Sequence, residues 1–249
     1  MLVLDGHPVE LEAHLERLSA SIGALYGAAL PSGARETVFD RARGVRHGKL
    51  RLTVVPRTGG RMETEVATTE VEPDQVFPSP ERGIALRSHV VEGGLGAHKW
   101  ADRRLLERAA AAASPGELPL LVDADGAALE ASRGSLFAAR DERLATPPTD
   151  GRILPSIARR QALEVARAEG IETREERLTL DDLRRGEVFL AGSVRGVEPV
   201  RCLDGIDLAT PGEVSARIAA GLRRRWLLVP QGESVAVVAG GRRGGPPAR

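Results

Sequence analysis

The chain of 249 residues is 42% hydrophobic and 28% charged, a composition typical of a soluble globular protein. Its 35 basic and 35 acidic residues give zero formal net charge, so composition provides no general attraction to nucleic acid or to an anionic membrane. No apolar run approaches the ~20 residues that span a bilayer, and the first residues lack the blocks of a signal peptide. The one cysteine, Cys202, allows no internal disulfide. We therefore expect a cytoplasmic protein with neither a nucleic-acid nor a membrane partner.

The first third of the chain is predicted to contain one helix followed by strands. Leucines and isoleucine at alternating spacings of four and three predict a helix that begins near Leu11 and is ended by Gly27. Residues 49–56 ("KLRLTVVP") and 59–72 ("GGRMETEVATTEVE") predict two strands around a Gly-Gly turn, and residues 83–91 predict a third.

A glycine-rich link separates this part from the rest of the chain. After the link, "KWADRRLLERAAAAA" predicts a helix, and "LPSIARRQALEVARAEG" predicts another between groups of strands. The last residues, "GGRRGGPPAR", have no capacity to pack. The sequence thus predicts an α+β fold: a small α/β domain at residues 1–91, a link at 92–98, a larger strand-rich domain at 99–235 and a disordered tail at 236–249.

Lysine is rare in a chain that otherwise uses arginine. Of the 35 basic residues only Lys49 and Lys99 are lysine. Arginine stays protonated at any working pH, whereas a buried lysine amine can lose its proton and act as a nucleophile. Only lysine can form a Schiff base with an aldehyde. Lys99, directly after the glycine-rich link, is therefore a candidate for such chemistry.

Five segments match one enzyme family in their order and spacing. They are "LEAHLERL", "HKWADRRLLE", "LVDADGAALEASRGSLF", "ATPPTDGRILPSIARRQALEVA" and "EVFLAGSVRGVEPVRCLDG". Over roughly residues 3–205 the chain resembles the class IV aminotransferases, the pyridoxal-phosphate enzymes of fold type IV. This family includes branched-chain aminotransferases, D-amino acid transaminases and aminodeoxychorismate lyases. The resemblance implies two domains, the larger a strand-rich pseudo-barrel, with pyridoxal phosphate as cofactor, a small amino substrate and a homodimer.

The resemblance gives two residues chemical roles. Lys99 matches the Schiff-base lysine, which would hold the cofactor and then shuttle the Cα proton of the substrate. Burial and nearby cations would have to lower its pKa for this task. Glu130 matches the glutamate that faces the pyridine nitrogen, keeps it protonated and so makes the cofactor an electron sink.

The same resemblance implies a phosphate site. Arg17 matches an arginine whose planar fork grips two phosphate oxygens. Ile157 and Ala158 match positions whose backbone N–H groups open a helix toward the phosphate. Ser193 matches a hydroxyl on the same group.

The sequence indicates the substrate-binding residues less clearly than the cofactor-binding residues. Arg51 and Arg57 lie in the segment where family members place groups for a substrate carboxylate, although either could equally be a surface residue. Arg195 is a further candidate by its position beside Ser193. We expect no metal ion at the site.

Some family features are missing. Members usually carry a further segment before the one matched here. Either the true start lies upstream of this sequence, or the small domain has lost a strand or two and has an open sheet edge. Branched-chain aminotransferases have a tyrosine shortly after the lysine, which "KWADRR" lacks, and Ser135 replaces an asparagine. Ala158 replaces a threonine, and the lost hydrogen bond to a charged group, worth roughly 1.5–3 kcal/mol, predicts weaker cofactor binding.

Three functions remain open at this point. The pattern K-x-x-D-R favours a lyase that releases pyruvate from aminodeoxychorismate and leaves 4-aminobenzoate. An aminotransferase would use the same residues to move an amino group from a branched-chain or D-amino acid to a 2-oxo acid. A non-catalytic binding protein is the third alternative, and the presence of both Lys99 and Glu130 argues against it.

Overall fold

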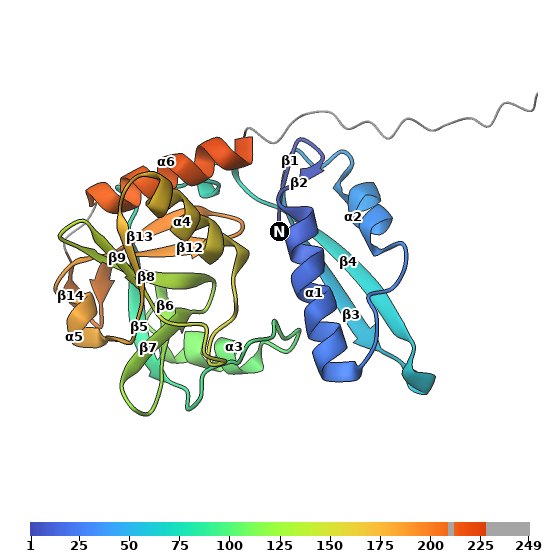
Figure 1. The fold of residues 1–249 in the computed structure, drawn as a ribbon, viewed down its shortest axis with the longest axis horizontal. Coiled ribbons are helices and arrows are strands. Elements are labelled where there is room, and N and C mark those ends of the chain that lie inside the picture. The colour runs from blue at the N-terminus through green and yellow to red at the C-terminus, as the bar shows by residue number, and fades with distance from the viewer. Residues whose placement is uncertain (209–211, 228–249) are drawn as a thin grey trace, which may run out of the picture.

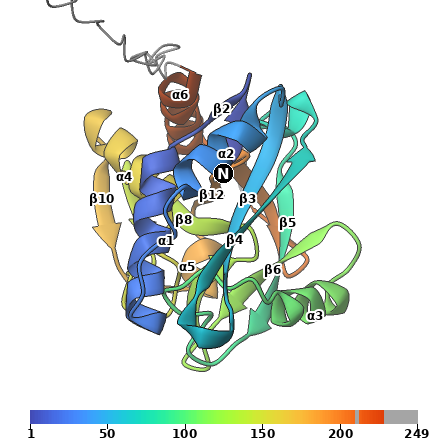
Figure 2. The ribbon, with the colours of Figure 1, turned by 90° about the vertical axis from the view of Figure 1, so that its right-hand side faces the viewer.

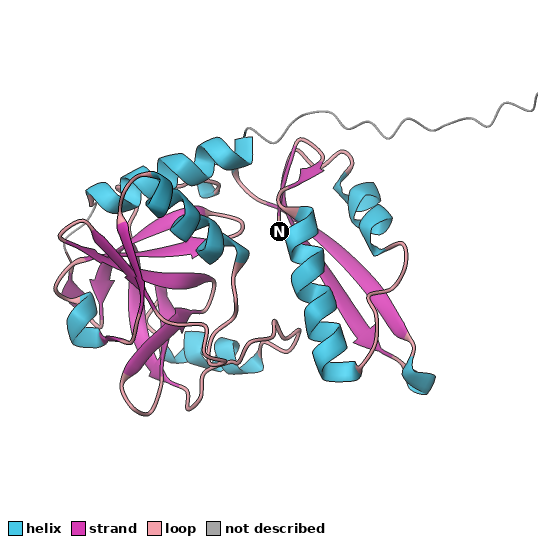
Figure 3. Ribbon diagram, in the orientation of Figure 1, coloured by secondary structure: helices cyan, strands magenta, loops and turns pink. Residues whose placement is uncertain are grey.

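The computed structural model describes residues 1–208 and 212–227, and these form two sheets with helices against each (Figures 1 and 3). The tail predicted to be disordered, residues 236–249, lies outside the described residues. Within the described part, no helix has the length and apolarity needed to cross a membrane.

The first sheet has four antiparallel strands in the order β2-β1-β3-β4, with β2 and β4 at its edges. Two helices complete this part of the chain, and Figure 2 shows it facing the viewer. The elements are β1 (Leu2–Leu4), β2 (His7–Pro8), α1 (Leu11–Tyr26), α2 (Ala34–Ala42), β3 (His47–Pro56), the 3-10 turn η1 (Thr58–Gly60), β4 (Met62–Glu70) and η2 (Pro73–Gln75).

Strand β3 has one apolar and one basic face. Leu50 and Leu52 pack with residues of α1 and α2. Because side chains alternate along a strand, Lys49 and Arg51 lie on the opposite face. The predicted helix end is also confirmed: Gly27 has φ 61°, and its N–H donates to the carbonyl of Gly23.

The second sheet contains ten strands and closes on itself. Its order is β10-β9-β8-β12-β13-β5-β6-β7-β11, with β14 beside β13. Strand β7 also pairs with β8, which joins β8, β12, β13, β5, β6 and β7 into a ring. The strands are β5 (Ile84–Val90), β6 (Glu117–Val122), β7 (Ala127–Ala131), β8 (Gly134–Arg140), β9 (Arg143–Thr146), β10 (Glu172–Glu175), β11 (Leu178–Thr179), β12 (Glu187–Gly192), β13 (Gly196–Leu203) and β14 (Ile206–Asp207).

The ring has an apolar core on both of its faces. One face buries Leu86, Leu120, Leu136 and other residues against one another. The other face includes Phe137 and Phe189, whose stacked rings lie 5.1 Å apart, and is covered by α4 and α6 (Figure 1). The helices of this part are α3 (Arg104–Ala112), α4 (Ile157–Ala168), α5 (Leu180–Leu183) and α6 (Glu213–Leu227).

The change from one sheet to the other comes earlier than the sequence suggests. Strand β5, placed by sequence in the first domain, pairs in parallel with β6 and β13 of the ring. Its Leu86 is fully buried in the core of that ring. The structure therefore puts the change of sheet between β4 and β5, not after residue 91.

The glycine-rich link and the residues after it form a loop between β5 and α3. The helix expected to begin at Lys99 begins at Arg104, whose N–H donates to the Asp102 carboxylate at 3.0 Å. Gly94 (φ 68°) approaches Arg152 so closely that a Cβ there would lie 2.1 Å from the Arg152 carbonyl oxygen. The loop therefore leaves Lys99 outside any helix, directly after a tightly packed turn.

Candidate active site

Lys99 and Glu130 come from different elements and act on each other. Lys99 lies in the loop between β5 and α3, and Glu130 lies in β7. The Glu130 carboxylate raises the pKa of Lys99, and the Lys99 cation lowers the pKa of Glu130. The loop is tied to the first part of the chain, because His98 Nδ1 and Ser21 Oγ of α1 share a hydrogen bond of 3.0 Å.

Lys99 has the electrostatic surroundings of a reactive amine. Its pKa falls from 10.5 to about 8, mainly because protein atoms displace water around it, and further because of the cations of Arg17, Arg103 and Arg51. By its accessible surface Lys99 is nevertheless an exposed residue. The amine is therefore crowded by protein while still open to a small molecule.

Glu130 is a buried carboxyl that accepts a hydrogen bond from one backbone N–H group. Burial raises its pKa from 4.5 to about 7; the backbone N–H of Leu154, which donates to Oε1 at 3.3 Å, and the nearby cations oppose the rise. In the described part of the chain it forms no ion pair within 4 Å. Beside it on β8, the buried Ser135 Oγ has no hydrogen-bond partner among the residues that the structure describes. Such a carboxyl suits a ligand group that carries a proton.

The start of α4 has the features of an anion site. Ser156 caps the helix by accepting from the N–H of Arg159 at 3.4 Å. The N–H groups of Ile157 and Ala158 make no hydrogen bond to any residue that the structure describes. Arg17 lies beside them, with Nη1 donating to the carbonyl of Pro155 at 3.5 Å. A cleft of about 450 Å³ contains Arg17, Ser156 and Ile157 among its lining residues.

Ser193 and Arg195 lie in the turn between β12 and β13. The guanidinium of Arg195 donates to Gln75 Oε1 at 3.1 Å, and its carbonyl accepts from the N–H of Phe77 at 3.1 Å. Arg195 is thus bound to the segment that connects the two sheets. Ser193 is half-buried, and its role at a phosphate stays a prediction.

The two candidate arginines of the first sheet have different surroundings. Arg51 acts on the pKa of both Lys99 and Arg103, which places its charge in the same group. Arg57 is exposed beyond the end of β3, where it pairs with Glu63 at 2.6 Å and Glu65 at 3.0 Å. The structure brings Arg51, and not Arg57, toward Lys99.

Two residues of this group were not selected from the sequence. Arg103, half-buried, donates to the carbonyl of Ser132 at 2.8 Å, directly after the strand that holds Glu130. His14 lies one turn before Arg17 on α1; burial above all, then nearby cations including Arg17 and Lys99, lowers its pKa from 6.5 to about 2, so its ring is neutral. The sequence contains one indication of His14, the i, i+3 spacing that puts it on the same side of a helix as Arg17.

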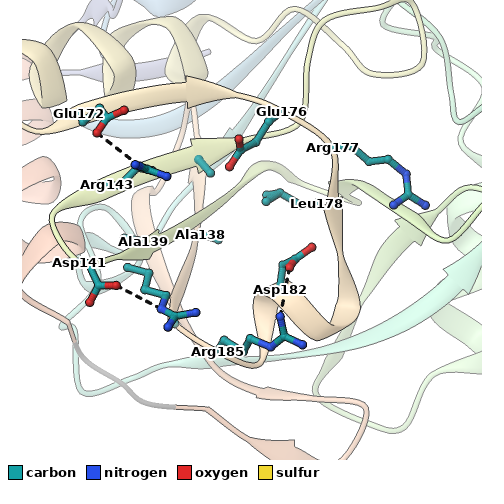
Figure 4. A pocket seen from close by; sticks show the side chains of 13 residues that line it. Ala138, Ala139, Asp141, Arg143, Glu172, Glu176, Arg177, Leu178, Asp182 and Arg185 are labelled. Carbon is teal, nitrogen blue, oxygen red and sulfur yellow. Dashed lines mark hydrogen bonds and ion pairs between the residues drawn. The ribbon is translucent and has the colours of Figure 1, made fainter.

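A second cleft lies away from this group. It has a volume of about 410 Å³ and is lined by residues around β8, β9, β10 and α5, including Arg143, Glu172, Asp182 and Arg185 (Figure 4). Most of its charges are paired within the cleft, and it contains none of the residues selected from the sequence. Among the described residues, no three His, Cys, Asp or Glu side chains gather as a metal site would require.

Solved structures share this architecture. A hypothetical aminotransferase from Mycobacterium tuberculosis in its PLP-bound form aligns with a TM-score of 0.75 and 25% identity, covering 91% of this chain and 87% of that one. The 4-amino-4-deoxychorismate lyase from Pseudomonas aeruginosa has the same fold, with a TM-score of 0.75, 22% identity and coverage of 90% and 88%. The fold is therefore that of the fold-type IV enzymes, as the sequence predicted.

The family follows from the sequence match. A family model described as amino-transferase class IV matches residues 1–203, so this chain belongs to the class IV aminotransferases, which are pyridoxal-phosphate-dependent enzymes. A branched-chain-amino-acid aminotransferase of Escherichia coli K12 is 35% identical over 102 residues, which are 40% of this chain and 33% of that protein. A putative branched-chain-amino-acid aminotransferase of Methanocaldococcus jannaschii is 33% identical over 112 residues, 43% and 39% of the two chains. The match thus spans well under half of these relatives.

Proposed function

We propose that this chain binds pyridoxal phosphate through Lys99 and uses the same amine to move a proton on a small amino substrate. The observation that carries the proposal is an amine with a pKa of about 8, within electrostatic reach of the buried Glu130 and of Arg17. A structural lysine on a protein surface would keep an ordinary pKa and would not share its surroundings with a buried carboxyl.

The residues present fit the cofactor. The free N–H groups at the start of α4 and the fork of Arg17 suit a phosphate. Glu130 suits a protonated ring nitrogen, and the unpartnered Ser135 Oγ beside it can take part in a further hydrogen bond. When bound, pyridoxal phosphate supplies an electron sink for the charge left on the substrate carbon after its proton departs.

Each of these residues then has its own role in the reaction. Glu130 holds the proton on the ring nitrogen, because a buried carboxylate is stabilised by a cation against it. Arg17 and the N–H groups of Ile157 and Ala158 fix the phosphate end, which orients the ring. The Lys99 amine, neutral in a substantial fraction near neutral pH, accepts the proton from the substrate carbon and returns it.

For the reaction itself we propose pyruvate release from 4-amino-4-deoxychorismate, leaving 4-aminobenzoate. What supports it is the segment after the lysine, where Asp102 and Arg103 occupy the place of a tyrosine-containing stretch and Arg103 lies in the site. An aminotransferase acting with a 2-oxo acid is the second candidate, favoured by the 35% identical stretch shared with branched-chain enzymes. We further expect a cytoplasmic homodimer.

The test measures pyruvate with and without an amino acceptor. The lyase releases pyruvate from 4-amino-4-deoxychorismate with no 2-oxo acid present, whereas a transaminase turns over only with an acceptor such as 2-oxoglutarate. Borohydride reduction of the yellow holoenzyme should fix the cofactor to Lys99, and Lys99→Ala should abolish this labelling. Labelling that survives in Lys99→Ala would remove Lys99 from the mechanism, and Lys49→Ala, which changes the other lysine, provides the matched control.

A further inference from the structure

The end of α6 packs against three segments that lead to the candidate phosphate site. The side chain of Trp226 is buried and shares an apolar cluster with Leu2 and Val9 of the first part of the chain. Val194, in the turn between β12 and β13, packs against the same cluster. The indole Nε1 of Trp226 donates to Gln161 Oε1 of α4 at 2.9 Å. One residue of α6 thus joins the first sheet, the β12–β13 turn and α4.

Arg225, the residue before Trp226, forms a bridge between α1 and α4. Its Nε donates to the carboxylate of Glu10, the residue directly before α1, at 3.2 Å, and its Nη1 donates to the carboxylate of Glu164 of α4. Within the described part of the chain, the Glu10 carboxylate has no other ion-pair partner within 4 Å. Its link to the second part of the chain therefore depends on Arg225.

The two bridged helices meet again at the candidate phosphate site. Arg17 of α1 donates to the carbonyl of Pro155, which precedes α4. Arg17 lies seven residues after Glu10, and Glu164 lies seven residues after Ile157. Seven residues make about two helical turns, roughly 10 Å along the axis, and return to the same face of a helix. The bridge therefore fixes α1 and α4 about two turns away from the groups that would hold the phosphate.

The geometry of the phosphate site consequently depends on contacts outside it. The donors come from different helices, so a slide or rotation of one helix against the other changes the distance between them. A displacement of about 1 Å is enough to weaken a ligand that both helices must reach. The Arg225 side chain is 39% exposed and that of Glu10 21%, and such a pair contributes little to folding by itself. Its removal should leave the fold intact and shift the donors.

We propose that Arg225 and Trp226 are positioning residues for the phosphate of the cofactor, although neither lines the cleft that contains Arg17. By holding α1, α4 and the β12–β13 turn against one another, they set the separation of the phosphate-binding groups on these segments. The inference rests on the proposed function and adds residues that act on its phosphate site from a distance. Disturbing the end of α6 weakens the hold on the phosphate and spares the hold on the ring.

The experiment compares pyridoxal phosphate with pyridoxal, which has the same ring and aldehyde and no phosphate. The dissociation constants of both are measured by absorbance titration of the cofactor-free protein. The constant for pyridoxal divided by the constant for pyridoxal phosphate is the phosphate preference. A variant that loosens the whole fold weakens the binding of both ligands, whereas a displaced phosphate site lowers this preference. Competition by inorganic phosphate reports on the same site without the ring.

Variants then locate the effect. Arg225→Gln should lower the phosphate preference about threefold to thirtyfold, as residues that act from a distance do. Glu10→Gln should also lower it, and adding Glu10→Gln to Arg225→Gln should change little more, because both remove one interaction. Trp226→Phe, which keeps a ring in the cluster and loses the indole donor, should lower it too. Arg224→Gln is the matched control: this adjacent, exposed arginine pairs with Glu169 directly after α4, and its loss should leave the preference unchanged.

Two results would overturn the inference. One is a wild-type phosphate preference in Arg225→Gln or in Glu10→Gln; the other is an equal weakening of both ligands in these variants. If Arg225→Gln or Trp226→Phe does not fold, Glu10→Gln still decides the question. The proposed function fails separately, through absence of borohydride-fixed cofactor on Lys99 in the wild-type protein. Normal fixation with unchanged preferences in the variants would reject the role of α6 and leave the proposed function standing.

Discussion

The lowered pKa of Lys99 gives a quantitative prediction about cofactor capture. The ordinary value of 10.5 and the value of about 8 in the site differ by about 2.5, so the neutral amine fraction at neutral pH is about 300-fold larger than for a free lysine. About one tenth of the amines are neutral at pH 7, compared with a few in ten thousand for the free side chain. Since only the neutral amine attacks an aldehyde, the rate of capture should follow this fraction.

The assay mixes the cofactor-free protein with pyridoxal phosphate at a series of pH values and constant ionic strength, and stops the reaction with borohydride. The rate, divided by the rate per neutral amine of N-acetyl-lysine at the same pH to remove the titration of the cofactor, should rise to a plateau with a midpoint near pH 8. A midpoint above pH 10 would refute the argument, because it would mean that the Lys99 amine behaves as a free lysine.

Charge variants test the causes of the shift. Glu130→Gln removes an anion that raises the pKa of Lys99, so the midpoint should move below pH 8. Arg103→Gln removes a cation that lowers it, so the midpoint should move above pH 8, and Arg104→Gln should leave it unchanged. Movement in the reversed directions would contradict the electrostatic account even if the wild-type midpoint were near 8.

Further predictions concern stability and cofactor affinity. The folded-state pKa of Glu130 is raised from 4.5 to about 7. The contribution of Glu130 to stability is therefore present below pH 4.5 and is lost as the pH rises to 7. Urea unfolding should show that the free energy of unfolding falls by on the order of 3 kcal/mol across this window, and Glu130→Gln should lack this fall. Gly94→Ala places a Cβ against the Arg152 carbonyl. This variant should lose about 1–3 kcal/mol more of the free energy of unfolding, measured with heat or urea, than Gly93→Ala, whose Cβ shares the positive φ and has no heavy atom within 4 Å. Equal losses in the two variants would show that the close approach is absent. Arg17→Ala should weaken pyridoxal-phosphate binding about tenfold to a hundredfold in an absorbance titration, and unchanged affinity would place the phosphate elsewhere.

Local patterns predicted α1 and α4 better than the boundary between the two sheets, whereas α2 and α6 were not predicted. The stripe on α1 and the capped start of α4 are local signals, and both helices occur where these signals indicate. The partner strands of β5 are distant in sequence: β6 lies beyond the glycine-rich loop, and β13 more than a hundred residues later. No property of residues 84–90 alone indicates such pairing, whereas the glycines that follow them favour a boundary at the glycine-rich link.

The residues of the candidate site could likewise be predicted only in part from the sequence. Lys99 could be selected because lysine is rare, and Glu130 through the resemblance. Arg103 lies only four residues after Lys99, whereas the proximity of His14 depends on how distant elements pack. The difference between Arg51 and Arg57 was partly present in the sequence. Side-chain alternation puts Arg51 opposite Leu50 and Leu52, and an antiparallel hairpin returns Glu63 and Glu65 past Arg57. That register could have been deduced from the Gly-Gly turn.

The hydrogen bond between His98 and Ser21 joins the loop of the amine to the helix of Arg17. The charges of the site come from both sheets. The free energy with which the two halves associate is therefore coupled to the free energy with which the site binds its ligand. Any ligand that touches both halves must tighten their association by the same factor by which that association tightens the ligand. A chain severed between β4 and β5 would therefore reassemble more strongly in the presence of its ligand than without it.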